Sequence, residues 1–404
     1  MLIPRNLLST LSLAASLMLF GCGGGESSTA QTDSDAVATN DTSSDSGTAP
    51  TGASETPSDA EAGGDAEDAA EKIPFEALYE QGLDRYLGLT FASSSVAVDG
   101  GGIAHSFDAS AGPMCFTGNE FVMSTRDGSE EDLMIFLEGG GGCGPGACNA
   151  VDITIPGVPR RGIMDPDDPA NPAAGFDMAY VPYCDGTLFI GDTDVDSDGD
   201  GMNDRFFRGL QNLSASLNVI HAAYPAPRRI LLAGNSAGGL GVHFALPLVR
   251  KLYPSTPIDL VNDSGVGIYE PGTVELLVEY WNGGSAIPAD CADCIGEDGN
   301  LTGFHDYQLD EDAGLRVAFI SSRQDEVITG TFGLISPEAF EAQLLEAVDE
   351  LVTAHPDRFA SLIAAGEEHT FIQRQFGYVV AGTTVREWIA DMLDGSPAWT
   401  SLSD

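Results

Sequence analysis

Basic side chains are scarce in this chain of 404 residues, which holds 17 Lys and Arg residues against 62 Asp and Glu residues. Its formal net charge is −45. Twelve of the acids lie between Glu26 and Glu71, so the segment from residue 73 onward keeps 50 acidic and 15 basic residues, a charge of about −35. Such an excess repels other polyanions over long range. We therefore expect no nucleic-acid partner and no attraction to anionic polymers.

Long apolar runs are missing beyond the N-terminus. Leu7 to Phe20, which follows Arg5, is too short for a comfortable membrane span and is typical of an export signal. The end of this run and the two residues after it, Leu19-Phe20-Gly21-Cys22, resemble the lipobox of bacterial lipoproteins. The resemblance implies a signal peptide at residues 1–21 and a diacylated Cys22. We expect an exported outer-membrane lipoprotein, or a protein of the cell surface or periplasm; an ordinary secretory signal is the alternative.

Bulky apolar side chains are almost absent from residues 23 to 72, which are rich in Gly, Ser, Thr, Ala, Asp and Glu. Such a segment buries too little surface to offset its chain entropy. We expect residues 22–72 to form a disordered acidic tether behind the lipid anchor. Residues 73–404 contain no second linker and no repeat, and we expect one domain there.

Short apolar runs alternate with helical patterns along residues 73–404. Strands that are apolar on both faces and alternate with helices are typical of a parallel sheet covered on both sides. The sequence therefore predicts an α/β-hydrolase-like fold, with a mostly parallel central sheet and helices on both faces. The strands are predicted at 133–137, 178–182, 229–233, 258–261 and 316–320, and the helices at 210–224, 239–252, 273–281, 337–354 and 386–393.

Gly234-Asn235-Ser236-Ala237-Gly238 lies between the strand predicted at 229–233 and the helix predicted at 239–252. A serine on such a tight strand-to-helix turn projects its hydroxyl above the sheet edge. The N–H of Ala237 then sits at a helix N-terminus, where it can face a developing oxyanion. This pattern predicts Ser236 as a nucleophile, whereas a serine that only caps the helix is the plainer alternative.

The catalytic acid of this architecture follows a late strand, and the histidine comes after the acid. Asp325 follows the strand predicted at 316–320 and is the expected acid, with Glu326 and Asp263 as rivals. For the base, His369 lies in a loop between helical patterns, where a catalytic histidine commonly sits. His355, at the end of a predicted helix, is the alternative.

The glycine run Gly139–Gly142 follows the strand predicted at 133–137. Its unshielded backbone N–H groups suit an oxyanion hole that faces Ser236 from the neighbouring loop. A flexible turn is the alternative reading of so simple a run.

Six cysteines remain once Cys22 is lipidated, an even number that predicts three disulfides in an exported domain. Cys143 and Cys148, and likewise Cys291 and Cys294, are close enough in sequence to pair locally. That would leave Cys115 to pair with Cys184. A zinc site built from the two close pairs is the alternative.

Residues 196–204 carry the acidic pattern D-x-D-x-D-G-x-x-D. Carboxylates at alternate positions of a turn can wrap a calcium ion. Phe207 stands where an EF-hand has its last glutamate, so we expect a structural calcium loop of a thrombospondin-like kind; a solvated acidic loop is the alternative. The expected ligands are Asp196, Asp198, Asp200 and Asp204.

Several motifs together resemble the pectin acetylesterase/Notum family of α/β-hydrolase serine esterases, over roughly Pro113 to Ile389. In chain order they are residues 136–140, 182–186, 191–192, 208–209, 234–239, 262–265 and 324–325. The resemblance implies Ser236 as nucleophile, Asp325 as acid and His369 as base. It also implies an oxyanion hole of Gly140, Gly141 and Ala237, and it favours the pairs Cys115–Cys184 and Cys143–Cys148. Family members commonly carry a Trp or Tyr where this chain has Gly141 and Gly142.

The sequence thus predicts a carboxylic ester hydrolase that works through an acyl-serine intermediate and needs no cofactor for catalysis. By the family resemblance, the ester is an O-acetyl group on a polysaccharide. A carboxylesterase acting on a lipid, a polyester or an acylated protein is the alternative, followed by an inactive surface binding protein.

Overall fold

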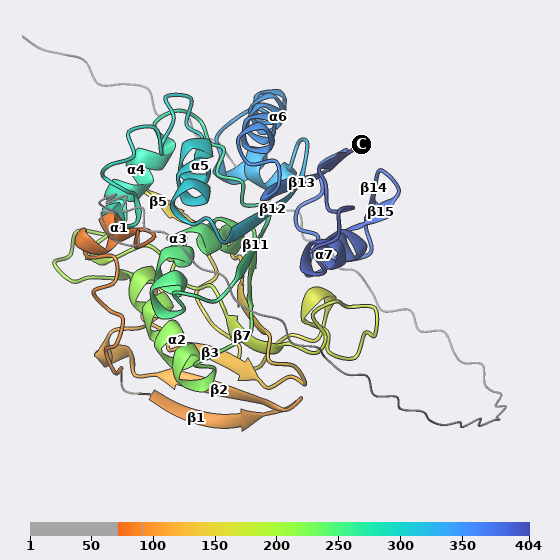
Figure 1. Cartoon of the computed structure of the whole chain (residues 1–404). Helices are drawn as coiled ribbons and strands as arrows, with labels where there is room; N and C mark the ends of the chain where they lie inside the picture. The colour runs from red at the N-terminus through yellow and green to blue at the C-terminus, as the bar shows by residue number, and fades with distance from the viewer. Residues whose placement is uncertain (1–71, 92) are drawn as a thin grey trace, which may run out of the picture. The chain divides into compact units, whose positions relative to one another are not determined.

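The computed structural model describes residues 72–91 and 93–404 (Figure 1). The predicted signal peptide, Cys22 and the tether as far as residue 71 lie outside the described residues. Within the described residues, no helix has both the length and the apolar character needed to cross a membrane.

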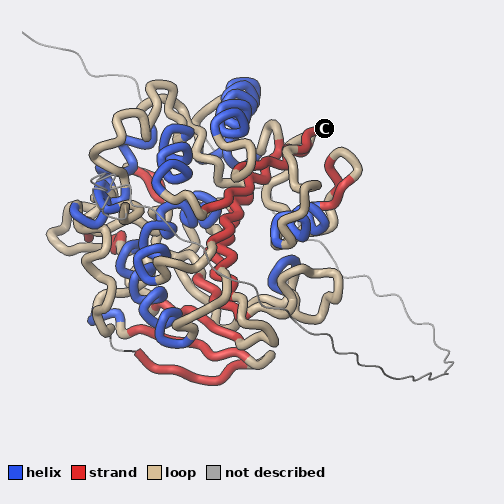
Figure 2. Tube along the Cα trace, in the orientation of Figure 1, coloured by secondary structure: helices blue, strands red, loops and turns tan. Residues whose placement is uncertain are grey.

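A ten-stranded sheet forms the centre of the fold (Figure 2). Seven of its strands are mutually parallel, in the order β7-β4-β10-β11-β12-β13-β16. Three further strands extend it beyond β7 in antiparallel fashion, in the order β1-β2-β3. The strands are β1 (Ser93–Val98), β2 (Gly102–Phe107), β3 (Phe121–Arg126), β4 (Leu133–Leu137), β7 (Asp177–Val181), β10 (Ile230–Asn235), β11 (Ile258–Asp263), β12 (Leu315–Ser322), β13 (Phe359–Ala364) and β16 (Leu402–Ser403).

The central strands are apolar throughout because both of their faces are buried. In β10, Ile230 and Leu232 join the hydrophobic cluster on one side of the sheet, whereas Leu231 and Ala233 join the cluster on the other side. Successive side chains of a strand point to opposite faces, so a strand covered on both sides reads as one continuous apolar run.

Helices cover the two faces unequally. Buried side chains of four helices join the hydrophobic cluster on one side of the sheet: α2 (Gly209–Ala223), α3 (Ala237–Leu252), α5 (Thr302–Glu311) and α6 (Pro337–Ala354). The other side carries α7 (Val385–Leu393), the short 3₁₀ helix Gly162–Met164 and loops (Figure 1). The predicted α/β-hydrolase-like architecture is confirmed, and among the described residues one α-helix, together with loops, covers the second face.

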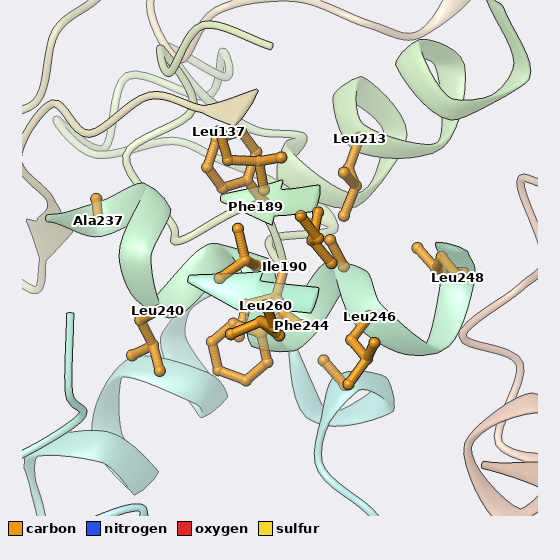
Figure 3. Packing of buried hydrophobic residues seen from close by; sticks show 14 of the residues in the cluster. Leu137, Phe189, Ile190, Leu213, Ala237, Leu240, Phe244, Leu246, Leu248 and Leu260 are labelled. Atoms are coloured by element: carbon orange, nitrogen blue, oxygen red, sulfur yellow. The ribbon is translucent and has the colours of Figure 1, made fainter. Parts of the chain in front are cut away.

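Helix α3 lies at the centre of the first side and presents Leu240, Phe244 and Leu248 to the core (Figure 3). Residues four apart share one face of a helix, so these three form a continuous apolar stripe. That stripe fixes α3 against the sheet, and its first turn begins directly after Ser236.

Smaller elements surround the sheet. They are α1 (Glu76–Glu80), α4 (Thr273–Tyr280) and three two-stranded hairpins: β5 (Cys143–Gly144) with β6 (Ala147–Cys148), β8 (Thr193–Val195) with β9 (Arg205–Phe207), and β14 (Val379–Val380) with β15 (Thr383–Thr384). The β5–β6 hairpin carries the predicted Cys143–Cys148 pair, and the β8–β9 hairpin borders the predicted calcium loop.

Candidate active site

Ser236 occupies the turn between β10 and α3 with φ 56° and ψ −124°. A non-glycine residue at positive φ is strained, and it persists where the surroundings hold it. Here the Ser236 N–H donates to the main-chain oxygen of Asp263 on the adjacent strand, at 2.7 Å. A Cβ on Gly238 would overlap the Leu137 carbonyl, and one on Gly234 would overlap the Gly238 carbonyl. The two glycines of the motif therefore permit the tight contact between strand and helix that the turn requires.

His369 and Asp325 complete a hydrogen-bonded chain with Ser236. His369 Nε2 lies 2.8 Å from Ser236 Oγ, and His369 Nδ1 lies 2.7 and 2.9 Å from the two Asp325 carboxylate oxygens. Asp325 is fully buried, and its Oδ1 also accepts the N–H groups of Val327 and Ile328 at 3.0 Å each. These bonds orient the carboxylate toward the imidazole. The three side chains have the arrangement of a nucleophile, a base and an orienting acid.

The rival residues lie elsewhere. His355 caps the end of α6, where its ring contacts Asp306 at 2.8 Å and Arg358 at 3.0 Å. Glu326 follows Asp325 and has no contact with the His369 ring among the described hydrogen bonds. Asp263 binds the backbone of the loop that carries His369 and not its ring.

The glycine run lies directly against the nucleophile, since a Cβ on Gly139 would come within 2.6 Å of Ser236 Cβ. Gly139 and Gly142 donate their N–H groups to the side chains of Asn235 and Asn149. Among the described residues, the N–H groups of Gly140 and Gly141 have no protein acceptor. Gly141 and Ala237 line the cavity at Ser236; Gly140 does not line it, and a Cβ on Gly140 would meet the side chains of Tyr183 and Val151.

Two cavities share walls beside Ser236. The smaller has a volume of about 30 Å³ and is lined by Ser236, Ala237, Gly141 and apolar side chains that include Leu240, Val266, Ile268 and Ile328. The larger has a volume of about 420 Å³ and lies between the β5–β6 hairpin and α4, with Leu276, Leu277 and Trp281 in its wall. Leu188 and Tyr269 line both. None of the described residues that line either cavity is charged.

All six cysteines of the domain are paired as disulfides: Cys115–Cys184, Cys143–Cys148 and Cys291–Cys294. This pairing confirms the disulfide prediction and contradicts the zinc alternative. The Cys143–Cys148 bridge joins β5 to β6 immediately after the glycine run, so it tethers the wall of the larger cavity to that loop.

The acidic loop connects β8 to β9. Asp196, Asp198 and Asp200 each offer a carboxylate oxygen, and these atoms lie within 4.8 Å of one another. Asp204 does not join them, because its carboxylate accepts the N–H and hydroxyl of Ser197 at 2.7 Å and contacts Arg205 at 3.2 Å. Hydrogen bonds from backbone N–H groups lower the pKa of the Asp196 carboxyl, and the bond from Gly201 has the largest effect. The predicted calcium site stays a prediction.

Some residues at the site carry no recognisable motif. Leu188, Val266, Ile268, Tyr269 and Ile328 shape the two cavities from positions spread over much of the chain. Ordinary apolar side chains in loops give no sequence signal for such a role. Asp263 had a signal, since it ends the strand beside β10 as Asp325 follows β12, but its contacts differ from those of a catalytic acid.

The doubly covered parallel sheet, with a serine on the turn after its central strand, places the chain among the α/β-hydrolase-like proteins. A family model described as Pectinacetylesterase matches residues 109–273. Over that segment the chain is similar to the pectinacetylesterase family, and this similarity indicates a carboxylic ester hydrolase of the acetylesterase type. The matched segment contains Ser236 and ends before Asp325 and His369. No curated protein matches the chain.

Proposed function

We propose that this protein is an exported serine acetylesterase that removes O-acetyl groups from an uncharged polysaccharide through an acyl-Ser236 intermediate. The unbroken chain from Ser236 Oγ through His369 to Asp325 carries the proposal. His369 Nε2 takes the proton of Ser236 as Oγ attacks the ester carbonyl, and Asp325 stabilises the imidazolium. The tetrahedral oxyanion then accepts hydrogen bonds from the N–H groups of Ala237, Gly141 and Gly140.

Collapse of the tetrahedral intermediate breaks the bond to the alcohol oxygen, and the His369 imidazolium donates its proton to that leaving group. A water molecule then attacks the acetyl-Ser236 carbonyl while His369 accepts the water proton. Acetate leaves, and the proton returns to Ser236 Oγ. No step in this sequence requires a cofactor.

The size of the cavity at Ser236 supports a small acyl group. A volume of about 30 Å³ has room for roughly two water-sized groups, enough for an acetyl methyl and little more. The walls from Leu240, Val266 and Ile328 are apolar, which suits a methyl group. We expect kcat/KM to fall steeply from nitrophenyl acetate to butanoate.

The charge of the domain supports an uncharged polysaccharide. A polyanion such as a polyuronate would approach a domain of about −35 against repulsion, and no basic side chain among the described residues lines either cavity. At low salt, an acetylated neutral polysaccharide should therefore be a better substrate than an acetylated polyuronate. Added salt should narrow the difference, because it screens the repulsion. A preference for the polyuronate at low salt would contradict this part of the proposal.

The larger cavity favours a second candidate function. A space of about 420 Å³ lined by Leu276, Leu277 and Trp281 suits a long acyl chain or another apolar group. The protein would then act as a lipase-like or polyester carboxylesterase. A kcat/KM that rises with acyl length from acetate to octanoate would favour this candidate over an acetylesterase.

The nucleophile and base are tested by substitution. A fluorophosphonate probe should label the wild-type protein and leave Ser236→Ala unlabelled. His369→Ala should abolish hydrolysis of nitrophenyl acetate. His355→Ala is the matched control, because it removes the same side chain from a site remote from Ser236, and it should keep near wild-type activity. Labelled Ser236→Ala, or loss of activity in His355→Ala alone, would refute the assignment.

Export and lipid anchoring form the remaining part of the proposal. They are supported by the lipobox-like sequence ending at Cys22 and by three disulfides, which form in oxidising compartments. Mass spectrometry of the mature N-terminus should find a diacylated cysteine, and Cys22→Ala should release the protein from membranes. An unmodified N-terminus at another residue would instead indicate an ordinary secretory signal.

A further inference from the structure

The end of strand β11 connects the nucleophile to the loop that carries the base. Asp263 is fully buried there. Its main-chain oxygen accepts the Ser236 N–H at 2.7 Å. Its carboxylate Oδ2 accepts the N–H groups of Phe371 at 2.8 Å and Ile372 at 2.9 Å. One residue thus touches the backbone on both sides of the Ser236–His369 hydrogen bond.

Ser264 extends this connection by one residue. Its hydroxyl donates to Asp263 Oδ1 at 3.1 Å and accepts the Thr370 N–H at 3.2 Å. Thr370, the residue after His369, has φ 71°, a strained conformation that needs support from its surroundings. Asn262 closes the turn beneath Ser264 through two hydrogen bonds with Gly265 at 2.9 Å. Three consecutive N–H groups after His369 are therefore held by the end of β11.

The charge of Asp263 calls for an explanation beyond this anchoring. Two N–H groups could be satisfied by a neutral amide oxygen, and a buried carboxylate is costly. Burial raises the pKa of the Asp263 carboxyl to about 6, while the two N–H groups and the nearby His369 act in the opposite direction. A charge kept at such a cost, beside a group that becomes cationic during the proposed reaction, suits electrostatic stabilisation of that cation.

We propose that Asp263 is a positioning residue for the catalytic base. It holds the His369 loop at the correct distance from Ser236, and its negative charge stabilises the His369 imidazolium formed during attack. The inference rests on the proposed serine mechanism. Asp263 exchanges no proton in it: the proton moves from Ser236 Oγ to His369 Nε2, and Asp325 keeps the hydrogen bond to Nδ1.

The charged groups around Asp263 are few. The nearby His369 acts to lower the pKa of the Asp263 carboxyl, and Asp325 contacts His369 Nδ1 at 2.7 Å. On the flanking strands, the residues in register with Asp263 are Asn235 of β10 and Ile320 of β12, and both are uncharged. A change of charge at Asp263 should therefore act mainly on His369.

Asp263→Asn tests the proposal, because an amide oxygen can still accept the two loop N–H groups while the charge is lost. We expect kcat for nitrophenyl acetate to fall about tenfold with little change in KM. We also expect the acidic limb of the kcat/KM profile to move to lower pH by about one unit, because the imidazolium loses stabilisation. Asp259→Asn is the matched control: it removes a buried carboxylate from the other end of β11, where Asp259 pairs with Arg316. That control should leave the profile unchanged.

Two outcomes would overturn the inference. A folded Asp263→Asn variant with wild-type kcat and an unmoved acidic limb would show that the charge has no role. A lower kcat with an unchanged acidic limb of the kcat/KM profile would show that Asp263 supports the loop but does not stabilise the imidazolium by its charge. Ser236→Ala, assayed in parallel with the fluorophosphonate probe, separates these results from failure of the serine mechanism: a labelled Ser236→Ala protein refutes that mechanism whatever Asp263→Asn does.

Discussion

The Asp263→Asn variant should be more stable than the wild-type protein at neutral and alkaline pH. The pKa of this carboxyl rises from 3.8 to about 6 on folding, so the folded protein holds the proton more tightly than the unfolded chain. The associated stability is fully present below pH 3.8 and is lost as the pH rises through 6. A shift of about two units corresponds to about 3 kcal/mol in the free energy of unfolding. The side chain in Asp263→Asn does not ionise, so the variant does not lose this stability as the pH rises.

The measurement is urea unfolding of both proteins at pH 4, 6 and 8. The advantage of Asp263→Asn should be small at pH 4 and should grow to about 2 to 3 kcal/mol at pH 8, after a loss of up to about 1 kcal/mol for the altered bond to Ser264. An advantage that does not grow with pH, or a less stable variant at pH 8, would refute the reasoning. Together with the expected loss of kcat, the variant would exchange activity for stability.

Asp132 provides a control, because its pKa is lowered in the folded protein whereas that of Asp263 is raised. It is fully buried, and although burial alone would raise its pKa, hydrogen bonds from Arg228 and Arg229 lower it. Its contribution to stability is present above its unfolded pKa and is lost as the pH falls through the folded value. Asp132→Asn should therefore be less stable than wild type at pH 8, and its deficit should shrink toward acid pH. The two asparagine variants should thus diverge in opposite directions.

Three further predictions concern the elbow, the acidic loop and the larger cavity. Gly238→Ala should abolish esterase activity and lower the melting temperature, because its Cβ would overlap the Leu137 carbonyl; near wild-type values in both assays would contradict the close packing. Millimolar calcium should raise the melting temperature of the wild-type protein more than that of Asp198→Asn, and hydrolysis should be unchanged in chelator. An equal rise in melting temperature for both proteins would indicate a solvated acidic loop without a calcium site. Leu276→Asp should lower kcat/KM for octanoate esters and spare acetate, because it places a charge in an apolar wall; equal loss for both substrates would separate the cavity from acyl recognition.

The sequence predicts the centre of the sheet well and its edges poorly. The run 133–137 appears as β4 with the same limits, and the helix predicted at 337–354 appears as α6. Both patterns are strong because they arise from burial, on two faces for the strand and one for the helix. Strands β1 and β2 have mixed composition and, at β1, exposed side chains, so no apolar run marks them. Strand β13 is buried but carries Ala and Ser between its apolar residues, which weakens its signal.

The candidate site divides in a similar way. Ser236, Asp325 and His369 could be proposed from chain order, because the carboxyl ends of parallel strands gather at one edge of a sheet. The volumes of the cavities could not, since they depend on how Leu188, Tyr269 and other ordinary side chains approach from separate loops. The partners of the Asp263 carboxylate could not be predicted either, because nothing in the sequence indicates that it binds the backbone N–H groups of Phe371 and Ile372.

The order of the site along the chain has a consequence for how activity is acquired. The nucleophile strand β10 pairs with β4 and β11, all of which end by residue 263. The base comes more than 100 residues later, in a loop that follows β13 and is held by Ser322, whose hydroxyl donates to the Glu368 carbonyl at 2.7 Å. During synthesis, a growing chain therefore contains the nucleophile strand before it contains the base. Because hydrolysis requires both Ser236 and His369, we expect the return of activity after refolding to require the docking of β13 and the loop that follows it.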